Sequence, residues 1–191
     1  LTSVFCYDSL MNIVILGDGL LGGEIIKQSC WNYISRKKDG FSIDTIDNFL
    51  SPDIDVIINC IAYTDTYSEN RKSNWDVNCV YVDKVIDYCN KHNIKPVHCD
   101  NWYGYTKLLS DGLVQLRSKN FLLIRCSHKP CPFTYEGAWI DYIGNFDYVD
   151  VIADLIIKSV LKNLSGVYNL GTEMKSMYDM ASETSIPIKT I

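Results

Sequence analysis

The chain has 191 residues, of which 47% are apolar and 21% charged, with a formal net charge of −5; this composition predicts one packed domain and argues against disorder. The basic residues are scattered except at 36–38, which argues against the basic face that nucleic-acid backbones require. No apolar run approaches the roughly 20 residues of a membrane-spanning helix, and no secretory signal pattern is visible. We therefore expect a cytoplasmic protein with no nucleic-acid or membrane partner. The eight Cys follow no regular framework, so we expect reduced, buried thiols.

Apolar runs alternate with helix-periodic segments along the chain. Strands are predicted at 12–17, 31–37, 55–62, 94–99, 120–126 and 166–171. Helices are predicted at 20–30, 74–93, 105–119 and 149–163, with a short helix or turn at 43–52. This alternation indicates an α/β domain with a parallel sheet. The first strand starts cleanly at Met11, so we expect residues 1–10 to be an extension and 11–191 to form a single domain.

A glycine-rich loop, "GDGLLG", follows the first strand and opens the first helix. The first glycine of such a loop permits a tight turn, the second lets the backbone approach a pyrophosphate, and the third allows the helix to pack closely on the strand. The helix N-terminus then offers N–H groups to the phosphates. We therefore predict a dinucleotide-binding, Rossmann-like fold, a doubly wound parallel sheet with helices on both faces; the alternative is a glycine-rich turn without a ligand. The predicted contacts in the loop are Gly17, Asp18, Gly19, Leu20, Leu21 and Gly22.

The end of the second strand bears on which dinucleotide binds. An acidic residue about 20 positions after the glycines would bind the ribose 2′-hydroxyl of NAD. Here the strand ends in Ser35, Arg36 and Lys37, and an Arg at this place accommodates the 2′-phosphate of NADP. We therefore expect NADP(H) as the preferred cofactor and NAD(H) as the alternative. A solvated basic loop is the other interpretation of this short charge run.

Tyr103 and Lys107 lie four positions apart at the start of a later helix. This spacing places both side chains on one helix face. A free Tyr has a pKa of about 10, and a neighbouring ammonium lowers that pKa because it stabilises the phenolate. Such a Tyr can protonate a carbonyl oxygen as hydride arrives from a nicotinamide. The alternative is a surface pair without a chemical role.

Together these motifs resemble the extended short-chain dehydrogenases/reductases that act on nucleotide sugars, and most closely the dTDP-4-dehydrorhamnose reductase family. Beyond the glycine loop, the resemblance rests on "DVIINCIAYTDT" (55–66), "WDVNCVYVDKVIDYC" (75–89), "WYGYTKLLSD" (102–111) and "FDYVDVIADLIIKSV" (146–160) with "GVYNLG" (166–171). It covers roughly residues 11–181.

The resemblance implies a reductase, or an epimerase/reductase, of a 4-keto-6-deoxy nucleotide sugar. Tyr103 would donate the proton, and Lys107 would tune it and hold the nicotinamide ribose. Further cofactor contacts are expected from Asp44, near the adenine, and from Cys60, Ile61 and Ala62. Substrate contacts are expected from Tyr63, Thr64 and Asp65. The resemblance leaves open a homodimer or a partner subunit.

Departures from the family pattern keep a second function open. Cys99 stands where the family has a Ser or Thr that binds the substrate carbonyl, and a thiol is the weaker hydrogen-bond donor. The segment between Cys99 and Tyr103 and the substrate-binding portion, about 126–191, are short. The chain is then an enzyme with an abridged pocket, a non-catalytic dinucleotide-binding subunit that docks on a partner, or a chain from which segments are absent.

Three other groups of residues contain side chains of types that bind metals, transfer protons or line pockets. Cys126, His128 and Cys131 lie close together but lack a fourth ligand at a familiar spacing, so we predict no metal site. His98 lies on an apolar strand and is expected to be a core residue. The aromatic residues that could line a pocket, or equally belong to the core, are Trp102, Tyr105, Tyr135 and Trp139.

Overall fold

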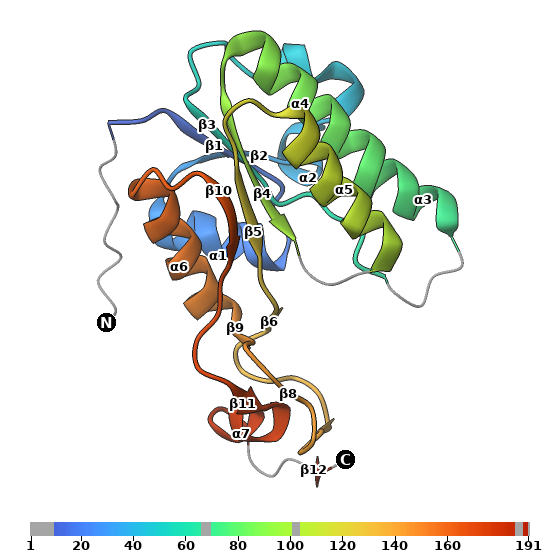
Figure 1. Ribbon diagram of the computed structural model, residues 1–191, viewed down its shortest axis with the longest axis vertical. Helices are drawn as coiled ribbons and strands as arrows, with labels where there is room; N and C mark the ends of the chain where they lie inside the picture. The colour runs from blue at the N-terminus through green and yellow to red at the C-terminus, as the bar shows by residue number, and fades with distance from the viewer. Residues whose placement is uncertain (1–9, 66–69, 101–103, 186–188, 191) are drawn as a thin grey trace.

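A six-stranded sheet forms the centre of the computed structural model, which describes residues 10–65, 70–100, 104–185 and 189–190 (Figure 1). All neighbouring strands run parallel, in the order β10-β5-β4-β3-β1-β2. The strands are β1 (Ile13–Leu16), β2 (Asn32–Ile34), β3 (Val56–Asn59), β4 (Lys95–Asp100), β5 (Leu122–Arg125) and β10 (Gly166–Asn169). Five of them fall within a predicted strand, β4 continues one residue past the predicted end at Cys99, and the Rossmann-like parallel fold is confirmed.

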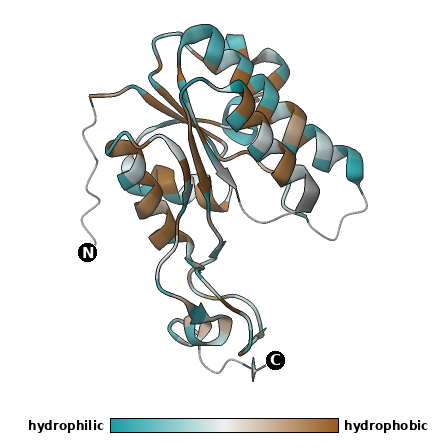
Figure 2. Cartoon of the chain, viewed as in Figure 1, coloured by the Kyte–Doolittle hydropathy of each residue, from teal (hydrophilic) through white to brown (hydrophobic). Residues whose placement is uncertain are grey.

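Helices cover both faces of this sheet, which explains why its strands are continuous apolar runs. One face carries α1 (Leu20–Ser29) and α6 (Val149–Leu161), and the other carries α4 (Tyr81–His92) and α5 (Gly104–Arg117). Figure 2 shows apolar strands between helices that turn polar residues outward. The sheet is therefore doubly wound, as predicted.

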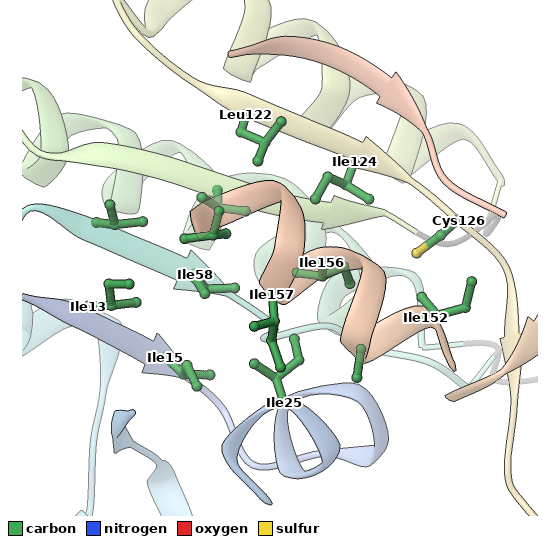
Figure 3. Close-up of a cluster of buried hydrophobic side chains, with 14 residues drawn as sticks. Ile13, Ile15, Ile25, Ile58, Leu122, Ile124, Cys126, Ile152, Ile156 and Ile157 are labelled. Atoms are coloured by element: carbon green, nitrogen blue, oxygen red, sulfur yellow. The ribbon is translucent and has the colours of Figure 1, made fainter. Parts of the chain in front are cut away.

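Side chains of β1 alternate between the two cores because successive residues of a strand point to opposite faces. Ile13 and Ile15 pack beneath α1 and α6, against Ile25 and Ile156 (Figure 3). The intervening Val14 and Leu16 instead join the core on the opposite face. The sheet is thus fixed between two apolar layers. This packing also fixes the edge of the sheet at which the carboxyl ends of the parallel strands lie.

Shorter helices connect the strands. They are α2 (Arg36–Asp39), the 3₁₀ helix η1 (Ile43–Asn48), α3 (Arg71–Trp75) and the π-helical turn η2 (Asp76–Val80), which leads into α4. The predicted second strand extended to Lys37, and this is wrong, because Ser35 caps α2 by accepting a hydrogen bond from Lys38 N. The predicted short helix or turn at 43–52 is confirmed as η1.

A small lobe extends from the carboxyl edge of the sheet near β5 and β10 (Figure 1). Its core is a cluster of apolar side chains that includes Phe146, Tyr148 and Met180. Tyr148 Oη donates to the backbone oxygen of Met180 at 2.6 Å and so attaches the lobe's helix to its strand. The elements of the lobe are β6 (His128–Lys129), β7 (Gly137–Ala138), β8 (Ile143–Gly144), β9 (Asp147–Tyr148), β11 (Lys175–Ser176), α7 (Met177–Ser182) and β12 (Lys189–Thr190).

The cysteine prediction is only partly right. Cys79, Cys89 and Cys126 are buried thiols, and burial raises the pKa of Cys89 to about 12. Cys131 is a free but exposed thiol. Cys30, which caps the C-terminus of α1 in a left-handed conformation, is exposed and disulfide-bonded. Within the described residues, no helix combines the length and apolarity needed to cross a bilayer.

Candidate active site

The glycine loop lies at the carboxyl end of β1, where the strand order reverses between β2 and β3. Open α/β sheets bind their ligands at such a switch point. Gly17 has φ +94° and donates its N–H to the carbonyl of Ile34 at 2.9 Å. A Cβ on Gly22 would lie 2.2 Å from the carbonyl oxygen of Gly17 and 3.1 Å from the Cβ of Cys60. The backbone conformation of Gly17 and the close packing around Gly22 therefore require glycine at both positions.

Gly19 differs from these two glycines. It caps the N-terminus of α1, and a Cβ built on it would meet no atom within 4 Å. No acidic residue stands in the first turn of α1, so the positive end of the helix dipole is not offset there. Leu20 is 53% exposed, whereas Leu21 packs against the core. The loop thus presents an open helix N-terminus of the kind that binds anions.

The end of β2 brings a carboxylate beside the predicted basic residues. Ser35 Oγ donates to Asp18 Oδ2 at 3.0 Å and accepts from Lys38 N at 3.1 Å, and the Ser35 residue is buried. Arg36 and Lys37 are exposed in the first turn of α2. Sequence reasoning placed Asp18 in the glycine loop and Ser35 in the second strand, and it missed the bond between them.

The segment after β3 is fixed at the same edge by two asparagines. Asn59 Oδ1 accepts from Ile61 N at 3.1 Å, which shapes the turn out of the strand. Asn78, fully buried on η2, accepts from Tyr63 N at 2.9 Å and donates to Tyr63 O at 3.2 Å. Cys60 N donates to Leu16 O at 2.9 Å, so this segment follows the end of β1. The partly buried Ala62 and Tyr63 and the exposed Thr64 and Asp65 therefore lie at the predicted edge of the sheet.

Lys107 is a buried residue of α5, with 2% of its surface exposed. Its neighbour His98 on β4 is also buried, and burial first, then the Lys107 charge, lowers the pKa of His98 to about 3. Burial raises the pKa of Cys79, and the Lys107 charge opposes that rise. Lys107 thus brings a positive charge under the carboxyl edge, next to a neutral imidazole, and is not a surface residue.

The partners of Lys107 in the predicted chemistry are only partly placed. Tyr103 lies outside the described residues, immediately before the first residue of α5. Cys99 pairs with Ile124 in the register of β4 and β5. The geometry that relates the phenol, the thiol and the ammonium therefore stays a prediction.

A cavity of about 600 Å³ opens at the carboxyl ends of β5 and β10. At its edge, Arg125 Nε donates to the buried Asp111 at 2.7 Å, and the Arg125 side chain is 40% exposed. The rings of Tyr142 and Phe146 stack in the lobe, with centroids 5.4 Å apart. The cavity is lined by Arg125, Cys126, Ser127, Tyr142, Gly144, Asn145, Phe146, Asn169, Leu170 and Gly171. It combines a cation, amides and stacked aromatic rings.

Sequence reasoning missed this cavity. The available signal was Arg125, a charged residue that ends an otherwise apolar strand. Tyr135 and Trp139, two of the aromatic residues that could line a pocket, are about half exposed and are not among the described residues that line this cavity.

Asp44 has a partner in the structure that the sequence did not predict. Asp44 on η1 forms an ion pair with Lys84 of α4, and both side chains are largely exposed. Its proposed contact with an adenine stays a prediction. Where the structure describes the chain, no three His, Cys, Asp or Glu side chains gather closely enough to hold a metal ion.

Comparison with known proteins rests on structure, because no family model and no curated sequence matches this chain. The structure of dTDP-4-dehydrorhamnose reductase from Bacillus anthracis, in complex with NADP, matches with a TM-score of 0.77 at 17% identity, covering 95% of this chain and 84% of that one. This chain has the fold of that reductase.

Two further solved structures share the fold. The UDP-glucuronic acid 4-epimerase of Bacillus cereus, in complex with NAD, matches with a TM-score of 0.71 at 16% identity, covering 95% of this chain and 86% of that one. The Bordetella bronchiseptica enzyme WbmG, in complex with NAD and UDP, matches with a TM-score of 0.69 at 13% identity, covering 96% and 83%. The Rossmann-like fold expected from the motifs is thus shared with these solved structures.

Proposed function

We propose that this chain is an NADP(H)-dependent reductase, or epimerase/reductase, of a 4-keto-6-deoxy nucleotide sugar. The observation that carries the proposal is the glycine loop at the β1–β3 switch point. Gly17 and Gly22 have reasons in the protein's own packing, whereas Gly19 faces open space. Approach of a pyrophosphate to the backbone supplies the reason for this glycine. The NADP and NAD bound in structures of the same fold support the same ligand class.

The residues around the loop fit a dinucleotide. The backbone N–H groups of Gly19 and Leu20 begin α1 and would face the pyrophosphate. Arg36 and Lys37, exposed at the start of α2, would hold a 2′-phosphate, which is why we place NADP(H) before NAD(H). The segment 60–62 would border the cofactor on its β3 side.

The bound nicotinamide would supply hydride, and the chain would supply a proton. Lys107 brings a buried positive charge to this edge, and its neighbour His98 is held neutral, so the imidazole adds no second positive charge beside it. A buried ammonium stabilises a phenolate and lowers the pKa of a nearby Tyr. We assign that Tyr to Tyr103, which would donate its proton to the substrate carbonyl.

The cavity beside β5 and β10 is the proposed place of the nucleotide sugar. The Arg125 guanidinium offers charged hydrogen bonds to a diphosphate, and Asn145 and Asn169 offer amides to hydroxyl groups. Tyr142, stacked on Phe146, offers an aromatic face to a base. Tyr63, Thr64 and Asp65 are proposed to contact the substrate from the β3 side.

The test is calorimetric titration with NADPH and NADH, followed by turnover assays with dTDP- and UDP-linked 4-keto-6-deoxy sugars. Tyr103→Phe should retain cofactor binding and lose turnover about 100-fold or more, as expected for loss of a general acid. Tyr168→Phe, which alters a tyrosine on β10, is the matched control and should keep full turnover.

The outcomes separate the alternatives. Cofactor binding without turnover of any keto sugar would favour a non-catalytic subunit. Failure to bind either cofactor would rule out both functions. An Arg36→Ala variant that kept its full preference for NADPH would remove the basis for placing NADP(H) first.

A further inference from the structure

The side chain of Asp18 leaves the glycine loop and reaches the end of β2. Its Oδ2 accepts a hydrogen bond from the Ser35 hydroxyl at 3.0 Å. The loop backbone is attached to the same strand end, because Gly17 N donates to the carbonyl of Ile34 at 2.9 Å. Two independent bonds therefore fix the position of this carboxylate relative to β2.

The end of β2 is where dinucleotide-binding folds discriminate between their two cofactors. An acidic residue about 20 positions after the glycines there accepts a hydrogen bond from the ribose 2′-hydroxyl of NAD. In this chain that position falls at Ser35, the first residue after β2, which has no charge. The hydrogen bond from Ser35 instead brings the carboxylate of Asp18 to this position.

Two other charged groups at this strand end, Asp39 and Lys38, are engaged by neighbouring residues. Asp39 accepts from Ser35 N at 2.9 Å, and Lys38 lies over the ring of Tyr33, 4.0 Å from its centroid. Asp18 is exposed, and Ser35 is the only side-chain partner recorded for it among the described residues. One carboxylate oxygen is thus held by Ser35, which leaves the other to face a ligand.

We infer that Asp18 is a cofactor-specificity residue: it binds the adenosine ribose 2′-hydroxyl of NAD(H) and weakens the binding of a 2′-phosphate. The inference rests on the proposed dinucleotide-binding function. Asp18 counteracts the basic residues of α2, so NAD(H) is accepted beside NADP(H) even though no acidic residue ends β2. Ser35 is a positioning residue that holds the carboxylate in place.

The test measures the dissociation constants of NADH and NADPH by calorimetry for the full chain and for Asp18→Asn. This substitution keeps the shape and removes the charge. The NADH dissociation constant should rise about tenfold, because a hydrogen bond to a charged acceptor is lost. The NADPH dissociation constant should fall about fivefold, because a like charge near the 2′-phosphate is removed.

Two further variants control the experiment. Asp53→Asn removes one negative charge at the opposite end of the sheet, before β3, and should leave both constants unchanged. Ser35→Ala should shift the ratio of the two constants in the same direction as Asp18→Asn but by less, with its melting temperature recorded because the cap of α2 is also lost.

The outcomes are distinct. Suppose that the unsubstituted protein binds at least one dinucleotide. If the ratio of the NADH to the NADPH dissociation constant then differs by less than twofold between Asp18→Asn and the unsubstituted protein, the inference is overturned and the proposed function stands. If the chain binds neither dinucleotide, both are overturned. A shift of the ratio toward NADPH in Asp18→Asn, absent in Asp53→Asn, supports the inference.

Discussion

Replacing His98 should make the stability of this protein less sensitive to acid. His98 lies in the middle of β4 with 2% of its surface exposed, and burial, followed by the charge of Lys107, lowers its pKa from 6.5 to about 3. Between these two values the unfolded chain binds a proton at this imidazole and the folded chain does not. The free energy of unfolding therefore has its full value above pH 6.5, the pKa of His98 in the unfolded chain, and it decreases as the pH falls below that value. Between pH 7 and pH 5 the loss from His98 is about 2 kcal/mol.

Urea unfolding of the protein and of His98→Gln, at pH 7 and at pH 5, measures this loss. The variant should lose about 2 kcal/mol less between the two pH values than the unsubstituted chain. His128, whose pKa burial lowers to about 4, contributes in the same direction, so His128→Gln is a matched variant and the double variant should combine both effects. An acid sensitivity of His98→Gln equal to that of the unsubstituted chain would refute the reasoning, as would an ordinary pKa for His98 in a proton NMR titration.

Three further predictions follow from the packing and the cavity. Gly22→Ala should abolish dinucleotide binding in calorimetry, because its Cβ would lie 2.2 Å from a backbone oxygen of the loop, whereas Gly112→Ala on α5 meets nothing within 4 Å and should stabilise the chain by about 0.5–1 kcal/mol. Tyr148→Phe should lower the unfolding free energy by about 0.5–1.5 kcal/mol, since the hydrogen bonds of the Tyr148 hydroxyl to Met180 O and to Thr184 are lost; no measurable change would contradict this. Arg125→Gln should raise the KM for a nucleotide sugar and leave the NADPH dissociation constant unchanged; a parallel loss of both would argue against a substrate role.

The strands and the glycine loop could be predicted because residues close in sequence specify each of them. Ile13–Leu16 is apolar throughout because both faces of β1 are covered, and this requirement is visible as a continuous apolar run. The spacing of Gly17 and Gly22 is likewise a local requirement, confirmed by the φ of the first and the close contacts of the second. The end of β2 was misjudged because the capping hydrogen bond of Ser35 competed with the extended conformation.

The cavity and the bond between Asp18 and Ser35 could not be predicted in the same way. Arg125 and Asn169 are far apart in sequence and meet only because β5 and β10 pair in parallel, with these two residues opposite each other. Asp18 and Ser35 meet because Gly17 attaches the loop to the end of β2. No local pattern records either encounter.

Local patterns were enough to predict the order of strands and helices along the chain, the glycine loop and the position of Lys107 at the start of α5, since short-range sterics and apolar periodicity specify these features. The burial of Lys107 beside a neutral His98, the place of Arg125 at the edge of a cavity and the hydrogen bond from Ser35 to Asp18 depend instead on the tertiary structure. The physical reason is that burial and hydrogen-bond partners depend on which strands pair and in which register. These are properties of the whole chain.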